Sequence, residues 1–124
     1  MTQETINKNQ LLADLKKFTG SEEFYFNPLF RKFRYTEGVK FLAQNANCYW
    51  LLDYVFSNQY EAVLKANEFQ TWKIQVIDNH KAIITVEDGN HKKLKSFKLD
   101  FTDFPLAEFT LWFVNDTLML PSEY

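Results

Sequence analysis

The chain has 124 residues, of which 14 are Lys or Arg and 16 are Asp or Glu, and its formal net charge is -2. This balance excludes a protein-wide basic surface of the kind that binds nucleic acid or an anionic membrane. The length fits one domain, residues 1–124. Apolar residues make up 46% of the chain and aromatic residues 18%, which is enough for a well-filled core. We expect residues 1–8 to be flexible.

The compartment follows from cysteine usage and from the beginning of the sequence. Cys48 is the only cysteine, so no disulfide can form within the chain. The first ten residues lack the basic start and apolar run of a signal peptide. The longest strongly apolar stretch, residues 48–56, is far shorter than the ~20 residues of a membrane span. We therefore expect a cytoplasmic protein that does not contact a membrane.

The first half of the chain shows helical spacing of its apolar residues. Asn7, followed three residues later by Gln10, is typical of a helix start, and leucines at helical spacing follow it. Thr36 precedes a second apolar stripe in the same way. Residues 48–57 are apolar almost all round, which predicts a deeply buried helix. The expected helices are 9–18, 37–46, 48–57 and 59–66.

After residue 67 the period of the apolar residues changes from 3.6 to 2, which indicates strands. The pairs Asp88-Gly89 and Asn115-Asp116 are typical of hairpin turns. Leu94 is out of phase with the apolar set of its strand, which predicts either a β-bulge near Lys95 or a strand that starts after it. The expected strands are 69–77, 81–87, 94–101, 109–114 and 117–120.

Helices followed by strands are typical of an α+β domain. We expect the N-terminal helices to pack on one face of a C-terminal antiparallel β-meander. The other face then carries Trp112, Val114 and Met119, which we interpret as a surface for a protein partner or for a homodimer. The lysine run of residues 92–98 is a second basic segment, which we interpret as lysines that discourage aggregation at a strand edge rather than as a polyanion site.

The segment 21–35 is rich in aromatic residues but has no period, so we expect a loop that its aromatic side chains pin to the body. Within it, FRKFRY at 30–35 places Arg31, Lys32 and Arg34 among aromatic residues that include Tyr35. Such a mixture can neutralise phosphates and stack bases of single-stranded nucleic acid. Because the chain is net acidic, a pinned loop with solvated charges is the favoured interpretation.

Asp53 stands inside the most apolar predicted helix and close to Trp50, a candidate binding residue. A buried carboxyl group can act as a general acid or base. With Glu22 or Glu123, Asp53 is therefore the candidate centre of a small enzyme or a small-ligand site. The favoured alternative is a structural carboxylate that accepts hydrogen bonds from a Tyr hydroxyl, a Trp N–H or an arginine.

Thiol or soft-metal chemistry has only Cys48, His80 and His91 as candidate residues. Both histidines fall in predicted turns, and none of the three stands at a zinc-ligand spacing from another. The sequence also lacks a glycine-rich phosphate loop and a nucleophile elbow. We expect no metal site and no cofactor.

The sequence ends on LPSEY. Proline cannot donate to a strand ladder, so Pro121 ends the last strand. Leu118 and Leu120, just before it, fix by their burial where the tail begins. We expect Tyr124 to pack on the body, and Glu123 or the terminal carboxylate to pair with a basic residue such as Arg34.

Six blocks follow one another in a distinctive order: FTGSEEFY at 18, RYTEGVKFLAQNANCYWLLDYVFSNQ at 34, FQTWKI at 69, EDGN at 87, TDFPL at 102 and LPSEY at 120. In these blocks the chain resembles an uncharacterised family of small bacterial single-domain proteins associated with plasmids and phages. The resemblance brings no known activity, so it implies no catalytic residue.

Three functional hypotheses follow. The first is a non-enzymatic binding or adaptor domain that serves a mobile genetic element by binding a host or defence protein, with Trp112 and Tyr124 among its binding residues. The second is the small enzyme or ligand binder centred on Asp53. The third is a single-stranded nucleic-acid binder that uses Arg31, Lys32 and Arg34.

Overall fold

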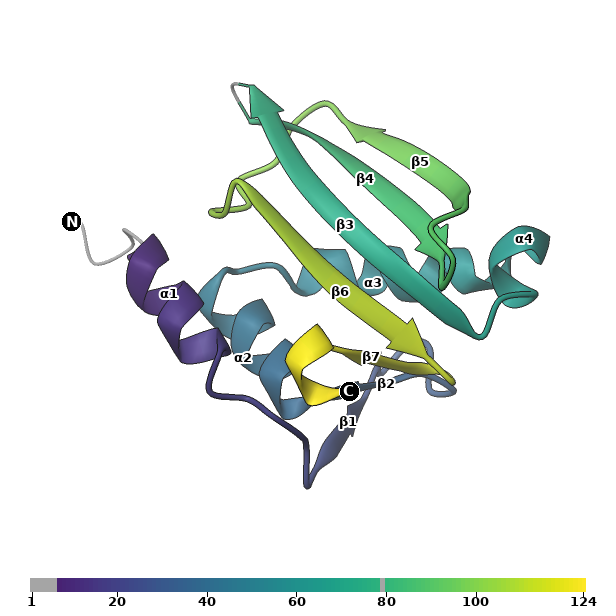
Figure 1. Cartoon of the computed structure of the whole chain (residues 1–124), viewed down its shortest axis with the longest axis horizontal. Coiled ribbons are helices and arrows are strands. Elements are labelled where there is room, and N and C mark those ends of the chain that lie inside the picture. Colours follow the sequence, from purple (N-terminus) through teal and green to yellow (C-terminus); the bar gives the residue numbers. More distant parts are fainter. Residues whose placement is uncertain (1–6, 79) are drawn as a thin grey trace.

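The computed structural model describes residues 7–78 and 80–124, and in these ranges it is an α+β domain with four α-helices and one seven-stranded sheet (Figure 1). The predicted class is confirmed. The helices are α1 (Lys8–Leu15), α2 (Glu37–Asn45), α3 (Tyr49–Ser57) and α4 (Ala62–Lys65). The strands are β1 (Phe24–Phe26), β2 (Arg34–Thr36), β3 (Phe69–Asp78), β4 (Lys81–Asp88), β5 (Lys93–Leu99), β6 (Glu108–Val114) and β7 (Thr117–Met119).

The strands lie in the order β1-β2-β7-β6-β3-β4-β5, so β1 and β5 form the two edges of the sheet (Figure 1). All neighbours are antiparallel except β2 and β7, which pair in parallel through Tyr35 and Leu118. This parallel pair joins the N-terminal strands to the C-terminal ones. In the view of Figure 1, α3 passes behind the sheet, and none of the described α-helices lies on the face toward the viewer, where the C-terminal 3₁₀ turn (yellow) follows β7.

The predicted five-stranded meander is wrong in two respects. The segment 21–35, expected to be a loop, contributes β1 and β2, and two further strands therefore extend the sheet. In addition, β6 pairs with β3 rather than with β5. The ten-residue β3 alternates buried and half-buried residues along most of its length and takes a central place, whereas the lysine-bearing β5 lies at an edge instead of in the middle of a meander.

Local signals in the helical half are mostly confirmed. The Asn7 side chain accepts the backbone N–H of Gln10 and caps α1, although α1 ends at Leu15, earlier than expected. Residues 1–6 of the segment expected to be flexible lie outside the described residues, and Lys8 belongs to α1. Thr36 caps α2 as predicted. The predicted helix 59–66 is instead a 3₁₀ turn, Asn58–Tyr60, followed by α4.

Turn and bulge predictions also hold. Asn115 and Asp116 have φ values of 49° and 65°, the left-handed pair of a two-residue hairpin turn. In the β4–β5 ladder, Val86 lies opposite Lys95 and Glu87 opposite Lys93. Leu94 is therefore the extra residue of a β-bulge, at the position where its phase indicated one.

The core lies between the helices and one face of the sheet. Within this core lies a buried polar cluster centred on Gln70, which is 0% exposed. The Gln70 amide nitrogen donates to Gln59 Oε1 (2.9 Å) and to two backbone carbonyls, and its oxygen accepts from Gln59 Nε2 (2.8 Å) and Trp72 Nε1 (2.9 Å). The apolar residues around it include Val39, Leu42, Leu52, Val55, Phe56, Leu64, Ile84, Leu111 and Leu118.

Gln70→Leu should lower the free energy of unfolding by about 3 kcal/mol, because it leaves the Trp72 N–H and the side-chain oxygen of Gln59 without partners in the core. Urea unfolding followed by tryptophan fluorescence measures this loss. Gln75→Leu, the same change on the half-buried outer side of β3, is the control and should shift stability by less than about 0.5 kcal/mol. Equal stability of the two variants would show that the cluster contributes nothing.

Candidate functional site

The uncovered face of the sheet carries a group of aromatic and apolar side chains that we call the outer patch: Phe69, Trp112, Val114, Met119 and Tyr124. Register places Phe69 opposite Val114 and Trp112 opposite Met119, so these four residues share one face. The ring centroids of Phe69 and Trp112 are 5.2 Å apart, and Tyr124 lies edge-on to both at 5.9 and 5.3 Å. Three rings from β3, β6 and the C-terminal segment thus form one aromatic cluster.

Beside the outer patch, the same face of the sheet carries residues of β2 and β1. Arg34 lies on the same face, where its Nε donates to Thr117 Oγ1 at 2.8 Å. Its guanidinium carbon lies 5.4 Å from the ring centroid of Phe24, a cation–π distance. Phe24 and Phe26 are 45% and 59% exposed. Aromatic residues, Met and Arg together are the residue types enriched in protein interfaces.

The segment after β7 positions Tyr124. Residues Pro121–Glu123 form a 3₁₀ turn, and the Glu123 carboxylate accepts three hydrogen bonds. The donors are the Thr36 hydroxyl (2.5 Å), the Gly38 N–H (3.0 Å) and the Leu120 N–H (3.0 Å). Ser122 Oγ donates to the carbonyl of Phe18 at 2.7 Å. Hydrogen bonds therefore hold the segment to the first turn of α2 and to Phe18, which follows α1.

Gly38 is required by this contact. A Cβ atom at residue 38 would lie 2.6 Å from Leu120 Cδ1 and 2.7 Å from Glu123 Oε1, closer than side chains tolerate. The anchored ending is as expected, but Glu123 takes neutral partners instead of Arg34, which is held by Thr117. Tyr124 does pack, by one edge, and remains 73% exposed.

The predicted helix 48–57 is not buried on every side. Asp53 is exposed, together with Tyr49 and Ser57, which stand four residues before and after it. This spacing puts the three side chains on one stripe of α3, opposite the stripe that faces the core. Asp53 Oδ1 accepts the side-chain N–H of Asn27 at 2.8 Å. The Asn27 oxygen in turn accepts the N–H groups of Leu29 and Phe30, which closes the turn after β1.

The other two carboxylates proposed to act with Asp53 lie near α2. The backbone N–H of Glu22 contacts the Glu37 carboxylate at 3.4 Å, and Glu123 bonds to Gly38. The structure thus brings Glu22 and Glu123 to the same helix end, while Asp53 lies on the exposed side of α3.

The basic-aromatic segment divides between two environments. Arg31 and Lys32 are exposed, whereas Phe33 and Tyr35, which alternate with the cations, are buried in the core. Burial raises the pKa of the Tyr35 hydroxyl, with smaller contributions from Tyr49, Tyr25 and Asp53. Buried rings are not available to stack on bases, because stacking needs an accessible ring face.

Two cavities are lined in part by candidate binding residues from the sequence analysis, Trp50 in one and Lys32 in the other. Trp50 lines a cavity of about 350 Å³ with Tyr54 and Phe101. A second cavity of about 230 Å³ brings together lysines, carboxylates and aromatic rings, and sequence reasoning missed most of it because its residues come from three separate segments. Its charged and aromatic residues are Lys32, Phe33, Tyr60, Lys65, Glu68, Phe113 and Asp116.

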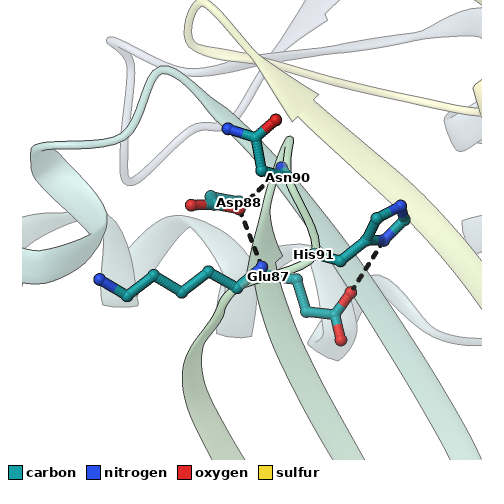
Figure 2. A network of polar contacts seen from close by, with 5 residues as sticks. Glu87, Asp88, Asn90 and His91 are labelled. Carbon is teal, nitrogen blue, oxygen red and sulfur yellow. Dashed lines mark hydrogen bonds and ion pairs between the residues drawn. The ribbon is translucent and has the colours of Figure 1, made fainter.

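The EDGN block closes the β4–β5 hairpin (Figure 2). The Asp88 carboxylate accepts the backbone N–H groups of Lys92 (3.0 Å) and Asn90 (2.7 Å), and these bonds lower the pKa of Asp88. His91 Nδ1 lies 3.7 Å from Glu87 Oε1 across the same turn. The block therefore has a structural role that explains its residue types.

The remaining candidates for thiol and metal chemistry lie apart. Cys48 is buried beside the carbonyl of Leu42, and burial raises the pKa of its thiol to about 12. His80 and His91 are exposed in turns, as predicted. Across residues 7–78 and 80–124, no cluster of three or more His, Cys, Asp or Glu has the arrangement of a metal site.

No described helix has the length and apolar character to cross a membrane.

Glu123→Ala should lower the free energy of unfolding by about 2 kcal/mol, because two donors at the start of α2 and the Leu120 N–H lose their acceptor. Glu108→Ala removes an exposed carboxylate and is the control.

Gly38→Ala should also destabilise the folded protein, although helix propensity alone predicts a gain of about 1 kcal/mol. Because residues 38 and 123 are in contact, a double-mutant cycle in urea should give a loss smaller than the sum. An additive cycle would contradict the contact.

Cys48 should not react with iodoacetamide or a thiol-exchange reagent in the folded protein, because the thiolate is the reactive form and burial suppresses it. Mass spectrometry after labelling near neutral pH should show no adduct, and the same sample in concentrated urea should label fully. Rapid labelling of the native protein would mean that the residue is accessible.

A comparison with protein families finds one family that matches most of the chain. A model described as "Family of unknown function (DUF6876)" matches residues 9–124, which include every helix and strand of the structure except the first residue of α1. Comparisons with curated proteins and with solved structures gave no match. From the extent of the family match, the chain belongs to the family of unknown function DUF6876.

Proposed function

We propose that this domain is a protein-binding module whose binding surface is the outer patch. The observation that carries the proposal is a contiguous group of aromatic rings on a sheet face on which none of the described α-helices lies (Figure 1). Soluble domains rarely leave a large apolar group uncovered unless it binds a partner. The partner is a protein with an apolar surface that matches the three rings.

The way in which the patch is built supports this function. Phe69 and Trp112 stand on long, central strands, which hold their positions firmly. Tyr124 is brought to them by a segment with hydrogen bonds at Glu123 and Ser122. Rings held in place before binding lose little conformational freedom when a partner arrives, and this favours affinity.

The position of Arg34 adds polar specificity beside the rings. Its Nε is tied to Thr117, and its guanidinium covers one side of Phe24. The remaining N–H groups of the guanidinium can donate to a carboxylate or a carbonyl of the partner. If the family is associated with plasmids and phages, as the resemblance implies, a host or defence protein is the partner class to test first.

Trp112→Thr together with Tyr124→Ser should abolish partner capture while the fold is retained, because Thr suits a strand and both changes lie on the uncovered face. The measurement is quantitative affinity capture from host extract, followed by titration of the purified partner. Phe101→Ser, which removes a ring that is 72% exposed elsewhere, is the control.

The proposal requires a protein that the wild type and the Phe101→Ser control retain and that the patch variant loses. A photo-crosslinking residue at position 119, in the middle of the patch, should then link to that same protein. If every captured protein binds the patch variant as well as the wild type, the outer patch is not the binding surface.

A further inference from the structure

The two edges of the sheet differ in how they are protected against pairing with another strand. The edge strand β5 carries Lys93, Lys95 and Lys98, and lysines on an edge discourage pairing. The edge strand β1 has the sequence Phe-Tyr-Phe and bears no charge. Its Phe24 and Phe26 side chains are 45% and 59% exposed. β1 is therefore the unprotected edge (Figure 1).

The backbone of β1 also offers hydrogen-bonding groups. The N–H of Asn27 donates to the carbonyl of Phe33, which makes Asn27 and Phe33 a hydrogen-bonded pair of the β1–β2 ladder. Bonded and non-bonded pairs alternate along antiparallel strands, so Tyr25 points its N–H and C=O toward β2. Those of Phe24 and Phe26 point away from the sheet, and no described residue bonds to them.

We propose that two copies of this chain pair through β1, antiparallel and across a two-fold axis, so that their sheets join into one. One register pairs all the outward-pointing backbone N–H and C=O groups of Phe24 and Phe26. In this register Phe24 of each copy lies opposite Phe26 of the other, and the two Tyr25 residues face each other at the axis. This register forms four backbone hydrogen bonds and two cross-strand Phe pairs on the outer face.

The charges around β1 fit this arrangement. Glu22 and Glu23 precede the strand and are exposed, whereas Arg31 and Lys32 are exposed in the turn that follows it. An antiparallel two-fold pairing brings the acidic end of one copy to the basic end of the other, and it does so twice. A parallel pairing would instead place like charges together. The edge is therefore self-complementary in charge as well as in shape.

The inference goes beyond the proposed function and can fail independently of it. Phe69 and Trp112 stand on β3 and β6, which β2 and β7 separate from β1, so pairing at β1 leaves the aromatic rings of the outer patch uncovered in both copies. The two proposals are tested with different substitutions.

The first test is sedimentation velocity of the full chain over a concentration series. The wild type should approach twice the 14.8 kDa of one chain as its concentration rises. Phe24→Lys combined with Phe26→Lys should remain a monomer, because lysines then oppose each other across the axis, and the corresponding Glu pair should also remain a monomer. Mixing the two variants should restore a dimer. Phe101→Lys should dimerise like the wild type.

The second test fixes the register without these charges. Opposite residues of a non-bonded antiparallel pair have Cα atoms about 4.5 Å apart, within the range that a disulfide spans. Tyr25→Cys should therefore form a disulfide-linked dimer under a mild oxidant, whereas Phe24→Cys and Phe101→Cys should not. A wild type that stays monomeric at every concentration, or a Tyr25→Cys chain that links no faster than the controls, would overturn the proposal.

Discussion

The first turn of α2 is the point on which the rest of the fold depends. A helix start leaves backbone N–H groups without partners, and here three of them are satisfied by side chains: one from the residue before the helix and two from distant segments. Ser21 accepts from Glu37, Thr36 from Val39, and Glu123 from Gly38. The blocks FTGSE, YTEG and LPSEY, far apart in the sequence, thus meet at one place. Their residues are explained by that contact, and Tyr124 reaches the outer face because of it.

Much of the fold could be predicted because its signals are local. The period-two pattern of β3, the Asn115-Asp116 turn and the Thr36 cap each involve residues within a few positions of one another. Strands β1 and β2 were not predictable in this way, since three residues are too few to show a period. In β1, moreover, both faces carry aromatic residues: Phe24 faces outward, and Tyr25 stacks on Tyr35 of the inner face.

The features of the candidate site divide in the same way, into those with a local sequence signal and those that depend on distant contacts. The exposure of Asp53 could have been inferred from its spacing with Tyr49 and Ser57, because one polar stripe on an apolar helix marks the side away from the core. The acceptor role of Glu123 could not, since it depends on a contact across 85 positions. Trp112 was placed on the uncovered face by alternation alone. Its association with Phe69 and Tyr124 depends on strand order, which no local pattern contains.

The parallel pairing of β2 with β7 has a consequence for how the protein is made. A ribosome delivers residues 117–119 after every other strand, yet β7 fills the gap between β2 and β6. Without β7 the sheet divides into two pieces, β1-β2 and β6-β3-β4-β5, and each has an unpaired strand edge where β7 inserts. The strand made last therefore closes the sheet, and a chain in which β7 is displaced exposes two strand edges at once.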